Sequence, residues 1–292
     1  MPSLNLSRTE LGADRFPIAR VFRQTLAVGL MLFAVCSAMA QDRAGNDIAG
    51  GDIAEKETAE KETTNADSPA TQSTSSDVLA PYVEAATKRW EKEIRKYEML
   101  DEQTDDPADG ILLIGSSSIR RWDTAAEDLS PFRVIPRGYG GAKYSDLAVF
   151  AQRLITPHDY RGVVIFVGND ISGRETDFTP EQVEPLVRHV VRISREHRPD
   201  APVLLVEVTP TRSRYDAWPK IRQLNAMLRE VCFTEPNVHF VATAETFLTH
   251  ENQPREDLFV EDQLHLNEAG YDLWGGLIRR RLTDVLREQA HD

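Results

Sequence analysis

Three consecutive serines, Ser116, Ser117 and Ser118, follow the apolar segment 111–114 and the glycine Gly115. An apolar run of this length that ends at a glycine is typical of a buried strand in a parallel sheet. Ligands of such sheets bind just beyond the carboxyl ends of the strands, which would place the serine hydroxyls at the mouth of a site. A serine hydroxyl becomes a nucleophile at neutral pH when a base accepts its proton. We therefore take Ser117 as the candidate nucleophile.

The base would be a histidine whose ring is oriented by a carboxylate. Of the seven histidines, His265 has an aspartate at a suitable offset, because Asp262 stands three residues before it, near the start of a late helix. In a turn or at a helix start, residues three apart can lie on the same side, so Asp262 could hold His265 while the ring faces Ser117. Taken alone, the pair could equally be a polar loop with a helix N-cap.

An acyl-transfer reaction also needs hydrogen-bond donors for the oxyanion that develops in it. Three candidates follow predicted strand ends: the backbone N–H of Ser117, the pair Gly140-Gly141, and the side-chain amide of Asn169. Glycines leave room for a ligand to approach the main chain. Singly, the glycine pair could be an ordinary turn and Asn169 an Asx turn. Their shared position after strand ends favours a common site.

The elements that would position these residues alternate between strands and helices. We expect strands near residues 111–114, 133–136, 162–167, 202–208 and 238–242. We expect helices near residues 81–99, 144–155, 180–197, 217–231 and 267–288. Such alternation implies parallel pairing and right-handed crossovers. The pattern predicts an α/β fold, a three-layer α/β/α domain over residues 79–292 with a five-stranded parallel, flavodoxin-like sheet whose strand order stays open.

Residues 1–40 have the pattern of a secretory signal peptide. Arginines at 15, 20 and 23 precede an apolar core over 26–35, and Ala38-Met39-Ala40 supplies a small-x-small cleavage site. The core is about half of the roughly 20 residues that span a bilayer. Lipid attachment at Cys36 is disfavoured, because Val35 stands where a bacterial lipoprotein signal usually has a small residue. We expect export to the periplasm or the medium after cleavage near Ala40; the alternative is a buried N-terminal helix.

Residues 41–78 are expected to form a disordered acidic linker. The sequence Ala-Glu-Lys-Glu-Thr occurs there twice in tandem, at 54–58 and 59–63, and the segment contains no aromatic residue. A composition of this kind buries too little apolar surface to offset the entropy of ordering the chain. We expect a solvated tether without activity of its own.

The composition of the whole chain narrows the classes of partner. The 292 residues carry a formal net charge of −13, which argues against nucleic acid or an anionic membrane as the main partner. Cleavage of the signal would leave Cys232 as the sole cysteine, so no intramolecular disulfide is expected, and Cys232 is interpreted as a core thiol. The histidines other than His265, such as His158, show no metal-ligand spacing and are interpreted as surface or packing residues. The oligomeric state stays open.

Four sequence blocks together resemble the SGNH hydrolase superfamily, also called the GDSL-like lipases and acylhydrolases. In chain order they are Gly115–Ile119, Gly138–Gly141, Gly168–Asp170 and Asp262–His265. They span about 150 residues, and no single block is specific by itself. Two departures stand out: Ser116 replaces the aspartate of the usual Gly-Asp-Ser, as in a subgroup with three serines, and Val167 replaces a frequent glycine and could reshape the wall of the site.

The resemblance implies a role for each matched residue. Ser117 would be the nucleophile, His265 the base and Asp262 the acid that orients the base. The N–H groups of Ser117 and Gly141 and the amide of Asn169 would form the oxyanion hole. The family's mechanism needs no metal and no cofactor.

The sequence thus predicts an exported serine esterase that cleaves a carboxylic ester. The favoured substrate is a small acyl group, such as acetyl, on a carbohydrate; the alternatives are a lysophospholipid or similar lipid ester, and a non-catalytic module that binds an acylated glycan on the same scaffold. A phosphate binder is disfavoured, because the serine turn lacks the glycines and lysine of a P-loop. Arg120 and Arg121 could contact an anionic leaving group or could be solvated helix charge.

Overall fold

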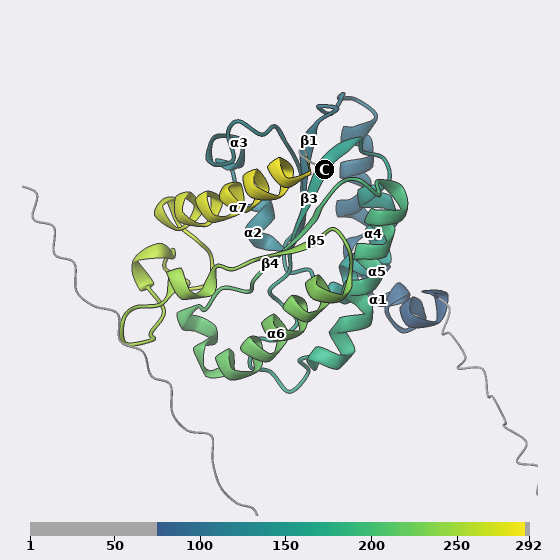
Figure 1. The fold of residues 1–292 in the computed structure, drawn as a ribbon. Helices are drawn as coiled ribbons and strands as arrows, with labels where there is room; N and C mark the ends of the chain where they lie inside the picture. Colours follow the sequence, from purple (N-terminus) through teal and green to yellow (C-terminus); the bar gives the residue numbers. More distant parts are fainter. Residues whose placement is uncertain (1–74, 290–292) are drawn as a thin grey trace, which may run out of the picture. The chain divides into compact units, whose positions relative to one another are not determined.

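The computed structural model describes residues 75–289 of the chain, coloured in Figure 1. The predicted signal peptide (1–40) and most of the predicted linker (41–78) lie outside this range. The first helix, α1 (Ser75–Asp101), begins four residues before the predicted start of the domain at residue 79.

Five parallel strands form one sheet at the centre of the described region (Figure 1). They are β1 (Gly110–Gly115), β2 (Val134–Gly138), β3 (Tyr160–Phe166), β4 (Val203–Val206) and β5 (Val238–Val241). Their order is β2-β1-β3-β4-β5, so β1 pairs with β2 on one side and with β3 on the other. This order has a topological switch point next to β1, where ligands of doubly wound folds bind. The predicted three-layer, flavodoxin-like fold is confirmed.

Helices cover both faces of the sheet. One layer contains α1, α4 (Tyr144–Ile155), α5 (Pro180–His197) and α6 (Trp218–Thr234), which pack against one another in that order. The opposite layer contains α2 (Ser117–Arg120), α3 (Ala125–Asp128) and α7 (Glu268–Glu288), and α3 packs against α7. Within residues 75–289, no helix is long and apolar enough to cross a bilayer.

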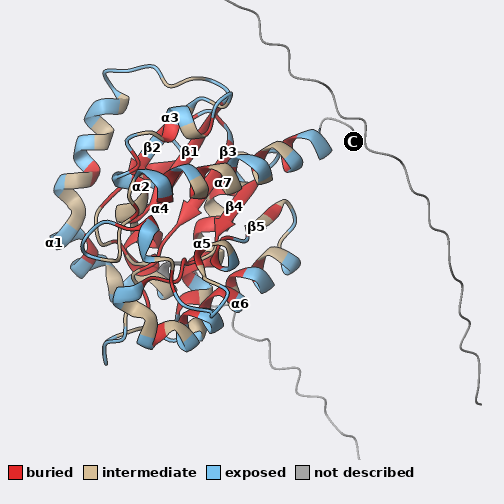
Figure 2. Cartoon of the chain, turned by 90° about the vertical axis from the view of Figure 1, so that its left-hand side faces the viewer, coloured by how far each residue is buried: buried red, intermediate tan, exposed pale blue. Residues whose placement is uncertain are grey.

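The central strand β1 shows why the sheet is buried on both faces. Leu112 and Ile114 pack into the core under α4 and α5, whereas Ile111 and Leu113 pack into the core under α7. All four side chains are fully buried, and the strands are correspondingly red in Figure 2. A strand that is apolar on both faces needs a helix layer on each side, which fixes the three-layer architecture.

The predicted elements match the structure best where a periodic apolar pattern is long. Helix α4 covers the predicted 144–155, and α5 begins at the predicted proline, Pro180. The second strand is shifted, since β2 runs to Gly138 and includes Pro136. A proline is tolerated there because β2 is an edge strand. The four-residue helices α2 and α3 are too short to show a helical period, and the pattern missed them.

Candidate active site

Ser117 stands at the carboxyl end of β1, where the chain turns sharply into α2. The turn depends on Gly115, whose φ is +138°. A Cβ at this position would lie 1.9 Å from the carbonyl oxygen of Phe166 on β3, so a side chain has no room. The N–H of Ser116 donates to the same carbonyl at 2.9 Å. The backbone therefore presents Ser117 at the edge of the sheet, half-buried.

His265 lies against Ser117 and selects it among the three serines. The distance from His265 Nε2 to Ser117 Oγ is 2.9 Å. Ser116 is buried as the N-cap residue of α2, and the backbone carbonyl of Ser118 accepts a hydrogen bond from the hydroxyl of Tyr271. Ser117 is thus the serine of this block with a base at hydrogen-bond distance.

Asp262 holds the other side of the imidazole ring. Asp262 Oδ2 lies 2.6 Å from His265 Nδ1, and Asp262 Oδ1 accepts the backbone N–H groups of Leu264 and His265, each at 2.9 Å. Gln263 has a φ of +51°, so the segment is a tight turn before α7. With Nδ1–H donated to the carboxylate, Nε2 is left to accept a proton from Ser117.

The electrostatic balance keeps Asp262 ionised. Burial raises the pKa of this carboxyl, but hydrogen bonds from the backbone N–H and the ring of His265, together with the Leu264 N–H, outweigh burial and lower the pKa to about 2. A negative carboxylate at neutral pH favours the ring tautomer described above and stabilises a positive ring when Nε2 takes up a proton.

The side-chain amide of Asn169 has a fixed orientation just beyond β3. Its Nδ2 donates to the carbonyl oxygen of Ala142 at 3.0 Å, and its Oδ1 accepts from Arg214 Nη2 at 2.8 Å. Arg214 Nη1 also donates to the carbonyl oxygen of Gly168. With the amide oxygen facing Arg214, the second Nδ2 hydrogen has no partner within residues 75–289 and is available to a ligand.

Gly141 lies in a loop that is tied to the Asn169 segment. The N–H of Tyr139 donates to the carbonyl of Gly115 at 3.0 Å, and the N–H of Tyr144 donates to Asp170 Oδ1 at 3.0 Å. Gly141 has a φ of +77°, which favours glycine. The structure therefore brings the loop of Gly141 beside Asn169, although Gly141 itself does not line the pocket at Ser117.

A small pocket opens between Ser117, Asn169 and His265. Its volume is about 30 Å³, which is room for only one or two water molecules. Its apolar wall is formed by Phe166, Val208, Ile221, Phe259 and Trp274, among others. The part of a ligand that this pocket encloses beside Ser117 is therefore short.

The expected influence of Val167 on this pocket is wrong. The Val167 side chain is buried in the core on the α4 and α5 side of the sheet and does not line the pocket. Valine in place of the family's frequent glycine therefore affects packing on the α4 and α5 side of the sheet. The residues on either side of it, Phe166 and Gly168, line the pocket.

Sequence reasoning missed Arg214, which lines the same pocket. Burial, followed by the neighbouring Arg174, lowers the pKa of the Arg214 guanidinium. Within residues 75–289, Arg214 forms no ion pair with a carboxylate, and its hydrogen bonds go to Asn169 and Gly168. Arg214 could have been found from its place after the fourth predicted strand, since the segment that contains it also follows the carboxyl end of a strand.

Replacing Arg214 with methionine is expected to lower kcat roughly ten- to hundredfold with KM within about threefold. The amide of Asn169 would lose the donor that fixes its oxygen, and one complete oxyanion donor is worth on the order of a hundredfold or more. Arg214→Lys should recover part of the rate. In an Asn169→Ala background, Arg214→Met should lower kcat little further, because the two residues act through one amide. Steady-state hydrolysis of p-nitrophenyl acetate measures all four variants; equal losses in both backgrounds would contradict the coupling.

Asp170, the residue after Asn169, is fully buried and titrates near neutral pH. Burial raises its pKa to about 7, against the hydrogen bond from the Tyr144 N–H. Because the folded state holds this proton more tightly than the unfolded chain, its contribution to stability is complete below about pH 4 and is lost as the pH rises towards 7.

Asp170→Asn should therefore flatten this part of the stability profile. The amide keeps an acceptor for Tyr144 and carries no charge, so we expect a melting temperature about 5 °C higher than wild type at pH 8 and little change at pH 4. Thermal unfolding followed by circular dichroism across this range provides the measurement. A uniform drop in melting temperature at every pH would contradict the prediction.

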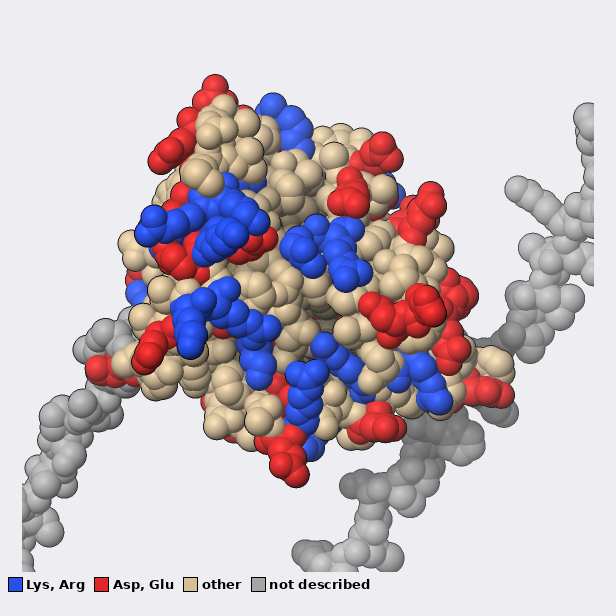
Figure 3. Space-filling view, turned by 180° about the vertical axis from the view of Figure 1, so that it is seen from behind, with Lys and Arg blue, Asp and Glu red and all other residues tan. Residues whose placement is uncertain are grey.

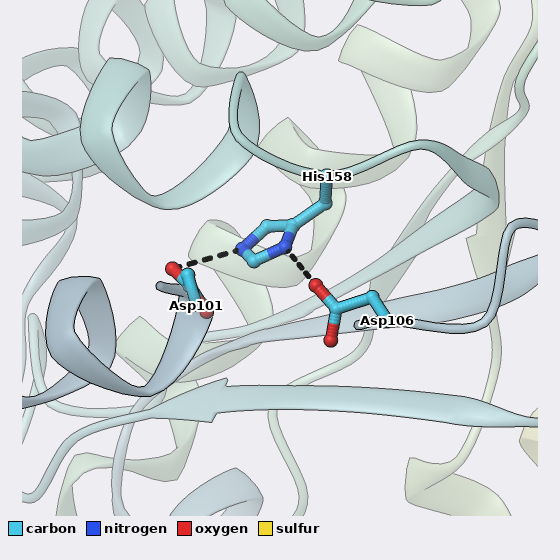
Figure 4. A group of neighbouring side chains, drawn as sticks. All are labelled: Asp101, Asp106 and His158. Carbon is cyan, nitrogen blue, oxygen red and sulfur yellow. Dashed lines mark hydrogen bonds and ion pairs between the residues drawn. The ribbon is translucent and has the colours of Figure 1, made fainter. Parts of the chain in front are cut away.

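A second cluster of ionisable groups joins the end of α1 to the segments that precede β1 and β3 (Figure 4). His158 Nδ1 lies 2.6 Å from Asp106 Oδ2, and His158 Nε2 lies 3.8 Å from Asp101 Oδ2. Among residues 75–289, these three side chains come close enough together to hold a metal ion. Arg137, however, donates to both carboxylates and already supplies a positive charge. We interpret the cluster as an ionic anchor that ties the end of α1 to the sheet.

The chain is similar to proteins of one hydrolase family. A model of the GDSL-like lipase/acylhydrolase family matches residues 108–273. No curated protein matches the chain.

Solved structures share its fold. A candidate platelet activating factor protein from Streptococcus pneumonia aligns with a TM-score of 0.60 at 19% identity, over 70% of this chain and 96% of that one. A GDSL-like lipase from Bacteroides thetaiotaomicron aligns with a TM-score of 0.55 at 18% identity, over 65% and 97%. A carbohydrate esterase family 3 protein from Talaromyces cellulolyticus aligns with a TM-score of 0.51 at 13% identity, over 62% and 99%.

Proposed function

The chain belongs to the GDSL-like lipase/acylhydrolase family, and from this premise we propose that it is a serine esterase with Ser117 as nucleophile and His265 as base. The observation that carries the proposal is the line of contacts from Ser117 Oγ to His265 Nε2 at 2.9 Å and from His265 Nδ1 to Asp262 Oδ2 at 2.6 Å. A hydroxyl, a base and an orienting carboxylate at these distances can perform acyl transfer on any fold.

In the proposed reaction, Ser117 Oγ attacks the ester carbonyl carbon while His265 Nε2 takes the hydroxyl proton. The oxyanion accepts hydrogen bonds from the N–H groups of Ser117 and Gly141 and from the Asn169 amide. His265 then gives its proton to the departing alcohol, which leaves an acyl group on Ser117. Water attacks that ester by the reverse route, and the acid product and free serine are released. No step needs a metal or cofactor.

The substrate we favour carries a short acyl group, such as acetyl on a carbohydrate. The pocket beside Ser117 has a volume of about 30 Å³, too small for a fatty acyl chain without rearrangement. A structural neighbour is named as a carbohydrate esterase. A lysophospholipase-like activity is the alternative, and a non-catalytic glycan-binding module is a second one.

Acyl-chain length provides the test of this proposal. We expect p-nitrophenyl acetate to be hydrolysed with a kcat/KM at least tenfold above the octanoate ester, because each added methylene must displace a packed pocket wall. Release of acetate from acetylated xylan, measured in parallel, reports on a carbohydrate substrate. Preference for octanoate would favour the lipid esterase, and absence of hydrolysis with all these esters and with lysophospholipids would favour the binding module.

Export remains part of the proposal. It is supported by the charged, apolar and small-residue segments of residues 15–40. Expression in a bacterium followed by N-terminal sequencing of the exported fraction should find Gln41 as the first residue. A cell-retained protein that still begins at Met1 would contradict export.

A further inference from the structure

Two guanidinium groups lie against the glycine pair proposed to help form the oxyanion hole. A Cβ on Gly140 would come within 2.9 Å of Arg120 Nη2 and 3.0 Å of its Nε. A Cβ on Gly141 would come within 3.3 Å of Arg89 Nη2. Arg120 reaches this loop from α2, and Arg89 reaches it from α1. The two glycines thus leave space that the guanidinium groups occupy.

Neither guanidinium is neutralised by the protein. Within residues 75–289, Arg89 and Arg120 form no ion pair with a carboxylate, and Arg89 stacks over the ring of Trp90 with its Cζ 4.6 Å from the ring centroid. Three glutamates of α1 are paired with other cations: Glu91 and Glu98 with Arg153, and Glu93 with Lys96. In a chain of net charge −13, Lys and Arg side chains nevertheless gather across the middle of the face shown in Figure 3.

A shallow hollow continues from Arg120 towards the candidate base. It has a volume of about 490 Å³ and is lined by Arg120, Arg121, Asp123, Leu266 and Tyr271. Leu266 follows His265 directly and lines both this hollow and the pocket at Ser117, so the two share one wall residue. One carboxylate, that of Asp123, faces two guanidinium groups here, which leaves the hollow with excess positive charge.

We propose that the alcohol part of the substrate carries an anionic group, either a carboxylate or a phosphate. Arg120 would bind this group together with Arg89 and Arg121. This inference rests on the proposed esterase function. The acyl group would occupy the small pocket beside Ser117, and the leaving alcohol, which His265 protonates, would extend over the hollow. A guanidinium binds the two oxygens of such a group through paired hydrogen bonds, which a neutral sugar cannot match.

The test compares three acetate esters that differ in the group para to the ester. 4-Acetoxybenzoate carries a carboxylate, 4-acetoxyphenyl phosphate a phosphate, and 4-acetoxybenzamide is the neutral isostere of the first. For each enzyme we take the ratio of kcat/KM between an anionic ester and the amide. Comparing this ratio between Arg120→Gln and wild type removes differences in leaving-group chemistry. The control is Arg280→Gln, an exposed arginine of α7 that lines a separate hollow with Arg161, at the amino end of β3.

Arg120→Gln should lower the ratio about fivefold, and the double variant, Arg89→Gln with Arg120→Gln, should lower it more than tenfold. The control Arg280→Gln should leave the ratio unchanged. For wild type, raising NaCl to 0.5 M should bring the ratio towards that of the double variant, because salt screens exposed charges. The anionic ester whose ratio falls further from wild type to the double variant identifies the group as a carboxylate or a phosphate. Ratios that are the same in wild type and the double variant would overturn the anion site and leave the esterase intact. If wild type hydrolysed none of these three esters, nor the p-nitrophenyl esters, acetylated xylan or lysophospholipids, both the anion site and the esterase would be overturned.

Discussion

Ser117→Ala is expected to reduce ester hydrolysis by roughly 10⁶-fold in kcat, with the substrate still bound. Removing the hydroxyl removes the atom that forms the acyl-enzyme, and among residues 75–289 His265 has no other serine hydroxyl at hydrogen-bond distance. The oxyanion donors would remain, so a small residual rate above water is expected. The loss of kcat is measured from the steady-state release of p-nitrophenol. The initial burst, which equals one equivalent per active site when deacylation is slow, should disappear with it.

Ser118→Ala is the matched control for this prediction. Ser118 stands one residue further along α2 and lines the same pocket, but within residues 75–289 the hydroxyl hydrogen-bonded to His265 is that of Ser117. We expect its kcat to fall less than tenfold, and both variants to keep the far-ultraviolet circular dichroism of wild type. If Ser117→Ala retained more than a hundredth of the wild-type rate, another residue would be the nucleophile.

Much of the candidate site could be predicted because its parts occupy fixed places in a parallel sheet. Ser117 and Asn169 follow β1 and β3, which are neighbours, so strand-end residues that are 52 positions apart converge. Asp262 and His265 could be paired because a three-residue offset works in a turn, and the turn contains Gln263 with a positive φ. In each case local chemistry and topology pointed to the same arrangement.

Other parts could not be predicted, because they depend on long side chains that cross between elements. Arg214 lies 45 residues after Asn169, in a short 3-10 helix (Arg212–Ala217) between β4 and α6, and the sequence carries no periodic signal for their contact. The cluster of Asp101, Asp106 and His158 likewise joins groups more than 50 residues apart in sequence. Strand order was also open, because the apolar patterns of β2 to β5 do not state which strands are neighbours.

The buried state of Asp170 shows the same limit for charge. From the sequence it is one of 47 acidic residues, and its titration near neutral pH follows only from complete burial beside β3. Burial of this kind is set by tertiary packing. Sequence patterns therefore locate the groups that react but not the environment that adjusts their charge.

Asp262→Asn is expected to reduce kcat on the order of 10⁴-fold while KM stays within about threefold. The Asp262 carboxylate accepts the Nδ1–H of His265, and so leaves Nε2 free to accept the proton of Ser117. An asparagine can still accept the backbone N–H groups of Leu264 and His265 through its oxygen. Its NH₂ group, however, would face Nδ1 and favour the opposite tautomer, in which Nε2 carries the hydrogen and cannot act as a base.

The control separates this tautomer effect from a loss of charge near the site. Asp257 is a nearby exposed carboxylate that pairs with Arg255 and does not touch His265, so Asp257→Asn should leave kcat within about twofold. Because the pKa of Asp262 is lowered to about 2, wild-type activity should show no step from this group between pH 5 and 9. A loss below tenfold in Asp262→Asn would mean that His265 keeps its working tautomer without the carboxylate. Asp262 would then serve mainly to hold the turn through the N–H groups of Leu264 and His265.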